Sequence, residues 1–499
     1  MLISGTATDI VDLLIYDEGV GISKVNDWVF LLRSDMPQTT FGAACDSEPA
    51  GHCSFLTSGS ATKFIRVQGN YSIMENAAQH LLQWILQIEP DVLDTLIPDD
   101  MDETTDSFLQ RRATTWGLNR IGADSRRFTG AGVTIYVQDT GIRVTHQEFG
   151  GRASTALDLT SGSAVECNGD LSCAGDRQGH GTHCAGTAAG QTFGVASEAT
   201  VKAVKTLSDQ GSGSRSWQYT AIDWVTVSGE RPAVISMSLG GSGADQGYAT
   251  VIDAAVASGV VVVVAAGNSN SDACNFSPAF ASNAITVGST TSTDARSSFS
   301  NYGSCVEIWA PGSSVLSASS SSNTGSRSLS GTSMACPHVS GAAALVLQGA
   351  PWMKSSAVLE ELLGTAYLGV LTDLKAGDTN ALVCVAEGGA PPTPTPAPTP
   401  APPPGSWVLS GSGCEVDGDC TQSLNYPGNY GDNQQCSVEL YGQFNVEWEA
   451  FNTERRYDFL NAGGSRYSGT SGPPKGAYTG TITWSSDYSV TRSGWRMCK

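Results

Sequence analysis

The chain has 499 residues and a formal net charge of −21, although only 15% of its residues are charged. It contains no cluster of lysine and arginine that would indicate a nucleic-acid site, and we interpret the acidic balance as favouring solubility. Its 13 cysteines indicate an oxidising compartment, and their odd number leaves at least one thiol without a partner in the chain. This length accommodates about three domains.

The start of the chain does not have the pattern of a secretory signal peptide. It lacks a basic segment, and Asp9 and Asp12 interrupt what would be the apolar core. Two explanations stay open, an incomplete chain start and export by another route, and the cysteine content favours the first. We leave residues 1–25 unassigned and expect an extracellular or secretory-pathway location.

Residues 26–112 alternate strand-like and helix-like segments. Apolar periodicity predicts strands over residues 27–34 (DWVFLLRS) and 63–72 (KFIRVQGNYS), and a helix over residues 74–88 (MENAAQHLLQWILQI). This region is therefore expected to form a small α+β domain.

Three longer motifs follow in the order Asp, His, Ser. The first, VTIYVQDTGI, is a predicted strand that ends at Asp139 before a turn. The second, GHGTHCAGTAAG, places His180 between glycines ahead of a helix of small residues. The third, GTSMACPH, places Ser333 at the start of a predicted buried helix, where backbone N–H groups and the helix dipole favour negative charge. Taken singly, each residue also fits an ordinary turn, a structural histidine or a capped helix.

Taken together, the motifs resemble the subtilisin-like serine proteases, whose catalytic residues occur in this order. The segments HGTHCAG, SLGG, AAGN and SFSNYGS are closest to the proteinase K subgroup. The resemblance covers roughly residues 113–385, and it places a catalytic domain over residues 113–389. It implies an α/β fold with a mostly parallel sheet between helices. The Val-rich run of residues 260–266 is too short to span a bilayer and is typical of a central strand of such a sheet.

The resemblance also implies the chemistry of peptide hydrolysis. Ser333 would be the nucleophile, His180 its general base, and Asp139 the group that orients the imidazole. Asn268 would donate to the tetrahedral oxyanion, although a turn residue is a competing interpretation.

Substrate is expected to bind as an extended strand. The resemblance implies walls and a primary specificity pocket formed by small residues, namely Ser212, Gly213, Ser214, Ser238, Leu239, Gly240, Ala265, Ala266 and Gly267. Because these segments place no acidic residue in the pocket, we expect cleavage after large apolar or aromatic residues. Each small residue taken alone also fits a turn or packing role.

Two positions depart from the family pattern, and several cysteines have an expected pairing or environment. Gln138 stands where the family usually has an apolar residue, and Cys336 stands where threonine is more usual. Cys184 matches a position that often carries a free buried cysteine, and we expect both thiols to be small buried apolar groups. The pairing of Cys274 with Cys305 follows from the resemblance, whereas pairs 167–173 and 45–53 follow from closeness in the chain. His183 is expected to be a packed histidine rather than a metal ligand.

The segment EPDVLDTLIPDD, residues 89–100, resembles the end of the inhibitor-type propeptide that precedes many such enzymes. The resemblance implies that residues 26–112 assist folding, block the cleft and are removed by the enzyme itself. The following segment TTWGLNRIGA resembles the opening of a mature protease, so processing is expected near residues 104–113. An unrelated small α+β domain is the alternative.

Residues 390–404 form a Pro-rich linker that is expected to be extended and solvated. Beyond it, NYPGNYGDNQQC and ITWSSDYSVTRSGW resemble a CUB domain, a small β-sandwich used for binding, over residues 405–499. The four cysteines of this region allow three connectivities, and the sequence does not choose among them.

Calcium is the structural cofactor that these resemblances imply, and none is implied for catalysis. In the catalytic region Glu307 stands where the family usually places an aspartate near a bound ion, which weakens that expectation. In the C-terminal region Glu454, Asp458 and Asp487 match the acidic positions that bind calcium in one CUB subclass. Solvated surface carboxylates are the alternative at each position.

The favoured hypothesis is a secreted, monomeric serine endopeptidase made as a self-processing zymogen. Its partners would be protein or peptide substrates, its own propeptide as inhibitor, and a protein or glycan ligand of the CUB-like domain, with no nucleic acid and no membrane span. A binding protein with a vestigial protease region is a second hypothesis, and an esterase or lipase is a third. The presence of all four of Asp139, His180, Ser333 and Asn268 argues against the second hypothesis.

Overall fold

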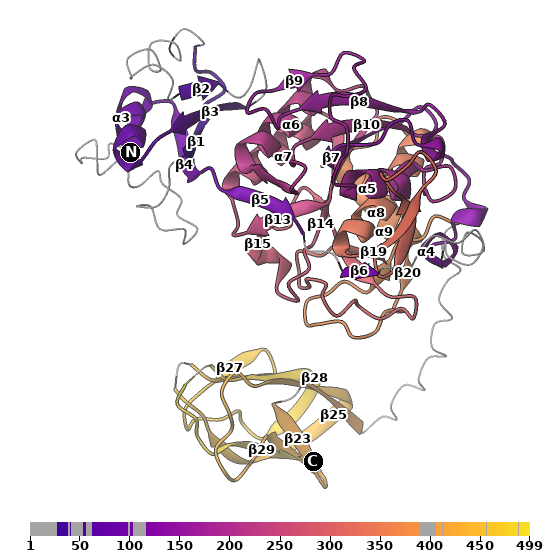
Figure 1. The fold of residues 1–499 in the computed structure, drawn as a ribbon. Coiled ribbons are helices and arrows are strands. Elements are labelled where there is room, and N and C mark those ends of the chain that lie inside the picture. The colour runs from indigo at the N-terminus through magenta and orange to yellow at the C-terminus, as the bar shows by residue number, and fades with distance from the viewer. Residues whose placement is uncertain are drawn as a thin grey trace. The chain divides into compact units, whose positions relative to one another are not determined.

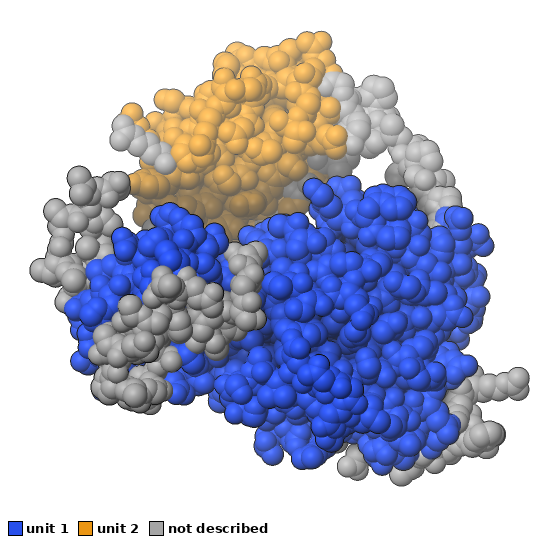
Figure 2. Space-filling model, turned by 90° about the horizontal axis from the view of Figure 1, so that it is seen from above, with its two compact units in different colours: residues 1–393 blue, residues 394–499 orange. Residues whose placement is uncertain are grey.

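The computed structural model describes residues 27–37, 40, 53–55, 62–97, 100–102, 116–388, 406–411, 413–455, 457–487 and 489–499. The chain divides into two compact units, Met1–Thr393 and Pro394–Lys499, which Figure 2 shows in different colours. The unassigned segment 1–25 and the linker 390–404 lie outside the described residues. No helix of the described part is long and apolar enough to cross a membrane.

The N-terminal part of the first unit is a four-stranded antiparallel sheet with one helix against it (Figure 1). Its strands lie in the order β2-β3-β1-β4, and Met74, Ala78 and Leu81 of the helix are buried in its core. The elements are β1 (Asp27–Leu32), β2 (Cys53–Phe55), β3 (Lys63–Gln68), α3 (Tyr71–Leu81) and β4 (Ile85–Pro90).

The helix predicted over residues 74–88 was placed too late in the sequence. It begins at Tyr71, after Asn70 accepts hydrogen bonds from the N–H groups of Ser72 and Ile73, and it ends at Leu81. Residues 85–88 instead belong to β4, which pairs with β1. Ile85 and Ile88 fit the helical spacing as well as the strand, so tertiary pairing decided between them.

The catalytic region is built on a ten-stranded, mostly parallel sheet, as the sequence predicted. One buried cluster packs on it with helices α5, α8 and α9, and a second packs with α6 and α7, so helices cover both faces (Figure 1). The strand order is β20-β21-β17-β16-β14-β12-β7-β10-β8-β9, and only the edge strands β9 and β20 pair antiparallel.

The strands of this sheet are β7 (Thr134–Asp139), β8 (Ala153–Asp158), β9 (Val165–Glu166), β10 (Thr200–Lys205), β12 (Ala233–Met237), β14 (Val260–Ala265), β16 (Ile285–Thr290), β17 (Ile308–Pro311), β20 (Tyr367–Leu368) and β21 (Ala381–Leu382). The helices are α4 (Trp116–Arg120), α5 (His180–Ala189), α6 (Arg215–Ser228), α7 (Gln246–Ala257), α8 (Thr332–Gly349) and α9 (Ser355–Thr365). The Val-rich strand β14 is buried along its whole length, as expected for a central parallel strand.

Two short sheets join the N-terminal part to the catalytic region. In the first, β5 (Leu93–Leu96) lies between β11 (Ser212–Ser214) and β13 (Leu239–Ser242), with β15 (Phe276–Ser277) beyond β13. In the second, β6 (Asp100–Asp102) pairs with β19 (Ser326–Ser330), which pairs with β18 (Val315–Ala318). Residues 93–96 and 100–102 therefore add strands to sheets that the catalytic region supplies.

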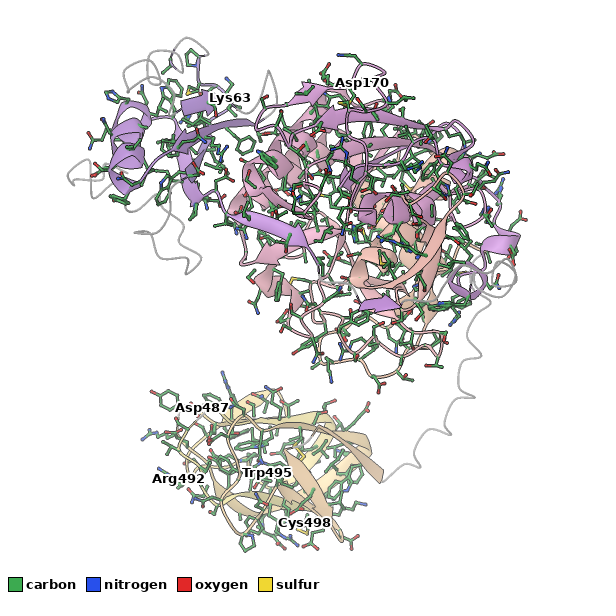
Figure 3. All side chains as sticks on the ribbon, in the orientation of Figure 1. Lys63, Asp170, Asp487, Arg492, Trp495 and Cys498 are labelled. Carbon is green, nitrogen blue, oxygen red and sulfur yellow. A yellow bond between two sulfur atoms is a disulfide. The ribbon has the colours of Figure 1, made fainter. Side chains whose placement is uncertain are left out.

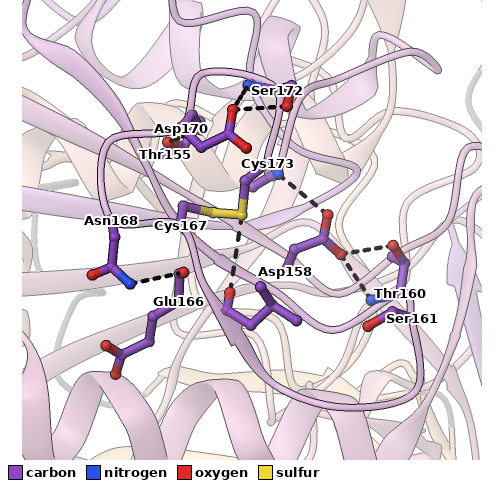
Figure 4. The surroundings of a disulfide bond; sticks show 12 residues. Thr155, Asp158, Thr160, Ser161, Glu166, Cys167, Asn168, Asp170, Ser172 and Cys173 are labelled. Atoms are coloured by element: carbon purple, nitrogen blue, oxygen red, sulfur yellow. Dashed lines mark hydrogen bonds between the residues drawn. A yellow bond between two sulfur atoms is a disulfide. The ribbon is translucent and has the colours of Figure 1, made fainter.

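Two predicted disulfides of the catalytic region are confirmed. Cys167 pairs with Cys173, in a loop where Asp158 and Asp170 accept hydrogen bonds from neighbouring backbone and hydroxyl groups (Figure 4). Cys274 pairs with Cys305. The pair predicted between Cys45 and Cys53 involves a residue outside the described ranges.

The second unit is built of β-strands, and the long strand β25 (Gln435–Asn452) pairs with several of them. Trp484 and Trp495 are buried in its core, and Figure 3 labels Trp495 and Cys498. Its disulfides select one of the three connectivities, Cys414 with Cys436 and Cys420 with Cys498. The other strands are β22 (Ser406–Gly411), β23 (Cys414–Asp417), β24 (Cys420–Ser423), β26 (Phe459–Ala462), β27 (Ser465–Tyr467), β28 (Gly476–Ser485) and β29 (Gly494–Cys498).

Candidate active site

Asp139 and His180 form a buried pair at the carboxyl edge of the parallel sheet. Asp139 ends β7, His180 begins α5, and the imidazole Nδ1 lies 2.8 and 2.9 Å from the two carboxylate oxygens of Asp139. The glycine after the histidine allows this approach, since a Cβ at Gly181 would lie 2.2 Å from the carbonyl oxygen of Gly141. A carboxylate on Nδ1 leaves the opposite ring nitrogen, Nε2, as the base of a neutral imidazole.

A second aspartate, to which the sequence analysis assigned no role, holds the turn before His180. The Asp176 carboxylate accepts hydrogen bonds from the N–H groups of Gly179 at 2.6 Å and Thr182 at 2.9 Å, and from the Thr140 hydroxyl at 2.9 Å. Thr140 in turn accepts from the N–H of Gly181 at 3.0 Å. These bonds tie the end of β7 to the start of α5. The sequence feature that could have identified Asp176 is an acidic residue just before a helix start.

Ser333 is the second residue of α8, and its hydroxyl is buried without a hydrogen bond to any residue that the structure describes. Pro337 has no N–H to donate to the Ser333 carbonyl four residues earlier. That carbonyl instead accepts from the Ser238 hydroxyl at 2.9 Å and the Cys184 thiol at 3.4 Å. The Cys184 sulfur also lies 4.0 Å from Nε2 of His180, so it packs against both the serine and the histidine.

Asn268 follows β14 and faces the start of the same helix. Its Oδ1 accepts hydrogen bonds from the N–H of Thr332 at 2.9 Å and from the Thr332 hydroxyl at 2.8 Å. With Oδ1 held on Thr332, the amide nitrogen is directed to the opposite side of the group. Because the N–H groups in the first turn of α8 have no acceptor within the helix, the N–H of Ser333 is a second donor near this amide.

The loop that carries Asn268 is fixed by Asn301, which lies in the SFSNYGS motif. Its Nδ2 donates to the carbonyl of Ala266 at 2.8 Å, and its Oδ1 accepts from the N–H groups of Ser269 and Ser271 at 3.0 Å. Gly267 adopts a φ of 103°, and a Cβ there would lie 2.4 Å from the Asn301 amide nitrogen. The motif is evident in the sequence, but the contact that explains it forms only in the fold.

The residues expected to form the substrate walls lie on both sides of β5. Thr95 pairs with Ser212 on one side and with Gly240 on the other, and Leu96 donates its N–H to the carbonyl of Gly211 at 2.8 Å. A segment of the chain itself therefore occupies the position and direction of an extended peptide between β11 and β13.

A pocket of about 150 Å³ lies beside this strand, next to the predicted specificity residues. None of its described lining residues is charged, and Ile97 contributes to it from the N-terminal part. The lining consists of Thr95, Ile97, Leu239, Gly240, Gly241, Ser242, Ala265, Ala266, Gly267, Asn268, Ser269, Phe276, Ser277 and Ala279.

The positions that depart from the family pattern, Gln138 and Cys336, are both buried. Gln138 is buried, and its Nε2 donates to the Gln218 side chain at 2.8 Å and to the Gln218 carbonyl at 3.1 Å, whereas its Oε1 has no hydrogen-bond partner among the described residues. Cys184 and Cys336 are unpaired and buried, and burial raises their pKa to about 11 and about 12. Both are therefore thiols rather than thiolates at neutral pH. Cys384 is a third unpaired, buried cysteine.

His183 is a packed histidine, as expected. Its Nε2 donates to the carbonyl of Val315 at 3.0 Å, and burial lowers its pKa to about 3. The ring is therefore neutral at physiological pH.

Glu307 is a poor candidate for a cation ligand. Burial raises the pKa of its carboxyl to about 8, and Oε2 accepts a hydrogen bond from the N–H of Thr286 at 2.6 Å. A carboxyl that is largely protonated at neutral pH and engaged by backbone does not suit Ca²⁺, which prefers ionised oxygen ligands.

The raised pKa of Glu307 predicts a pH-dependent stability. Between its ordinary pKa of 4.5 and the folded value of about 8, the folded protein binds more protons than the unfolded chain, so stability falls as pH rises through this window. Glu307→Gln cannot ionise and should remove this fall, which makes the variant more stable than its parent by about 2–4 kcal/mol at pH 8 relative to pH 5.

Urea unfolding at the two pH values measures this difference, with Ser333→Ala as the common parent to prevent self-digestion. The matched control is Glu360→Gln, at an exposed glutamate of α9. An equal stability difference at pH 5 and pH 8 for Glu307→Gln would contradict the assignment.

The acidic residues expected to bind calcium in the second unit do converge. Ligand oxygens of Glu454, Asp458 and Asp487 lie within 4.8 Å of one another, and Figure 3 labels Asp487. One Asp458 oxygen accepts from the N–H of Asp487 at 2.8 Å and the other from the Tyr430 hydroxyl. Burial and the two neighbouring carboxylates raise the pKa of Glu454. This set of hard oxygen ligands fits a Ca²⁺ ion.

The parallel sheet, the Asp–His pair at its carboxyl edge and a serine at a helix start define a serine endopeptidase with a subtilisin-like fold. Residues 130–388 match the model of the Subtilase family, and the chain belongs to that family.

Known relatives agree with this family. The extracellular serine proteinase of Thermus sp. (strain Rt41A) is 47% identical over 294 residues, which cover 57% of this chain and 69% of that protein. The alkaline serine exoprotease A of Vibrio alginolyticus is 38% identical over 406 residues, covering 76% and 73%. The crystal structure of a cold-adapted subtilisin-like serine proteinase superposes with a TM-score of 0.50 at 42% identity, covering 54% of this chain and 97% of that one.

Proposed function

We propose that this endopeptidase is secreted as a zymogen that processes itself, with Ser333 as nucleophile, His180 as general base and Asp139 as the orienting carboxylate. The observation that carries the proposal is the buried Asp139–His180 pair, with Cys184 packed against both His180 and Ser333. The extracellular relatives support secretion.

In this mechanism Nε2 of His180 takes the proton of the Ser333 hydroxyl as the serine oxygen attacks the substrate carbonyl. Asp139 stabilises the imidazolium that forms. The oxyanion of the tetrahedral intermediate accepts hydrogen bonds from the Ser333 N–H and the Asn268 amide. His180 then gives its proton to the leaving amine, and a water molecule, activated by the same nitrogen, hydrolyses the acyl-enzyme.

We assign residues 26–112 to an inhibitory propeptide and residues 113–389 to the catalytic domain. β5 lies in the peptide groove with Ile97 at the pocket, and β6 pairs with β19, which leads directly to Gly331 and Ser333. Both flanks of the cleft are thus engaged by the chain's own N-terminal part. Because Ile97 lies at the pocket, processing within residues 104–113 would be carried out by another copy of the enzyme, and release of the propeptide would then expose the groove.

The uncharged pocket supports cleavage after large apolar or aromatic residues. Internally quenched peptides that differ only in the residue before the cleaved bond test this, with Phe, Leu, Asp and Lys at that position and mass spectrometry to locate the cut. We expect kcat/KM for Phe and Leu to exceed that for Asp by about 100-fold, because a carboxylate would enter the pocket without a partner. Equal rates for Asp and Phe would contradict this specificity.

We assign residues 405–499 to a CUB-like accessory domain, joined by the linker 390–404, that binds a protein or glycan ligand. The two-disulfide β-structure around Trp484 and Trp495 and the convergent carboxylates support this assignment. A Ca²⁺ ion held by Glu454, Asp458 and Asp487 would neutralise their mutual repulsion and stiffen the loops that carry them.

A further inference from the structure

A buried charged pocket lies where β5 crosses the catalytic region. Asp94 of β5 is fully buried, and one of its carboxylate oxygens lies 3.2 Å from Nε of Arg215, the first residue of α6. The other oxygen accepts a hydrogen bond from the Tyr248 hydroxyl. Arg215 is itself held at 2.7 Å by Asp245, which also accepts from the Tyr219 hydroxyl.

Apart from Asp94, the catalytic region supplies all of these groups. Arg215 also donates to the carbonyl of Ser242 at 2.7 Å, so three partners fix its guanidinium. Gly241 leaves room for the incoming carboxylate, since a Cβ there would lie 2.6 Å from Oδ1 of Asp94. We call the set of Arg215, Tyr219, Gly241, Tyr248 and Asp245 the fourth-residue pocket, because it holds the side chain at the fourth position before the cleaved bond.

The register of β5 gives Asp94 a position relative to the cleaved bond. Thr95 pairs with Ser212 and Gly240 as an extended substrate residue would, and Ile97 lies at the primary specificity pocket. If a substrate follows the same path, the residue at the Ile97 position precedes the cleaved bond. Asp94 then marks the fourth residue before that bond.

We propose that the fourth-residue pocket selects substrates with an acidic side chain, aspartate or glutamate, at the fourth position before the cleaved bond, with Arg215 as the determining residue. The proposal rests on the proposed catalytic site and substrate direction. An apolar side chain would cover the Arg215 Nε–H and the Tyr248 hydroxyl without offering an acceptor, which is costly when both donors are buried. A carboxylate accepts from both, and charge-assisted hydrogen bonds are stronger than neutral ones.

Burial of the Asp94 carboxyl determines the pH at which the test is run. Burial raises the pKa of Asp94 to about 6 despite Arg215 and Tyr248, so an assay at pH 8 keeps this carboxyl ionised. The chain's net charge of −21 disfavours acidic substrates in general. A preference for an acidic residue at one position only is therefore a signature of the pocket rather than of the overall field.

The test uses the self-processed enzyme and internally quenched peptides. All peptides share Thr-Leu-Phe as the three residues before the cleaved bond, and they differ in the fourth residue before that bond, which is Asp, Asn or Leu. We expect kcat/KM for Asp to exceed that for Asn by about tenfold and that for Leu by more. A peptide in which Asp takes the Thr position keeps the net charge and should lose the advantage. Equal or faster cleavage of the Leu peptide would overturn the proposal, whereas the site of cleavage, read by mass, tests the proposed function separately.

Arg215→Met should lower kcat/KM for the Asp peptide by about 30-fold and leave the Leu peptide within about threefold. Arg127→Met, at an exposed arginine that stacks on Phe128, is the matched control and should keep the wild-type ratios. Loss of the Asp preference in Arg127→Met as well would overturn the assignment to Arg215. The wild-type peptide ratios decide the proposal even if Arg215→Met fails to fold.

Discussion

Ser333→Ala is expected to lower kcat for a peptide substrate by about a million-fold and to leave the purified chain at full length. The size of the loss is the one known for the nucleophile of subtilisin, a protease of the same type, because without the hydroxyl no acyl-enzyme can form. Intact-mass analysis of the wild type and the variant, each then incubated with casein, measures both effects. The wild type should lose about its first 110 residues by the proposed processing and digest casein.

The variant has an internal check on its folding. We expect a trace of active wild type to cut folded Ser333→Ala within residues 104–113, the proposed processing segment, and to leave the rest of the variant intact. A variant that processes itself and digests casein at the wild-type rate would refute the assigned nucleophile. If wild type and variant both stay at full length and casein survives, a binding protein with a vestigial protease region becomes the better hypothesis.

The residues of the candidate site were predictable because short motifs carry them. Asp139 and His180 each sit at an element boundary marked by glycines and small residues, and a strand end followed by a turn is a local signal. The groups that hold them were less visible. Asp176 accepts five hydrogen bonds from residues on both sides of the turn, and no sequence spacing shows that these atoms meet.

The mostly parallel sheet was predictable for a similar reason, since strand–helix alternation and the Val-rich β14 are strong patterns. The position of β5 was not. Its strand pairs are made with residues more than 100 positions away, and the segment 93–96 is too short to show a period of its own. The Asp94–Arg215 ion pair depends on that placement, so it became visible only in the fold.

The error in the helix over residues 74–88 has the same origin. Ile85 and Ile88 have the spacing of a helix face, but they are buried in β4, where a register shift lets Ile85 pair with Leu32 and Ile88 with Phe30. Pairing with β1 over Trp28 to Leu32 selected the strand. Local pattern therefore predicts which residues are buried more securely than it predicts which element buries them.

Asn268→Ala is expected to lower kcat by about 10²–10³-fold while KM changes little. This range comes from the equivalent donor in subtilisin and corresponds to about 2.7–4 kcal/mol of transition-state stabilisation. The amide should donate to the oxyanion, which exists only in the transition state and the tetrahedral intermediate, so its loss should appear in kcat rather than in substrate binding. Steady-state kinetics on one peptide, measured for both enzymes, separate the two parameters.

The orientation of the amide distinguishes this role from that of a turn residue. Thr332 holds Oδ1 through its N–H and its hydroxyl, so in the proposed mechanism the Nδ2 end of the amide would donate to the oxyanion. If Asn268 only shaped the turn, its replacement would lower the unfolding temperature or raise KM and leave kcat close to the wild-type value. Asn283→Ala, at an exposed asparagine bonded to Asp253, is the matched control and should leave both parameters unchanged. A loss in kcat confined to Asn268→Ala would therefore place this amide in the oxyanion site.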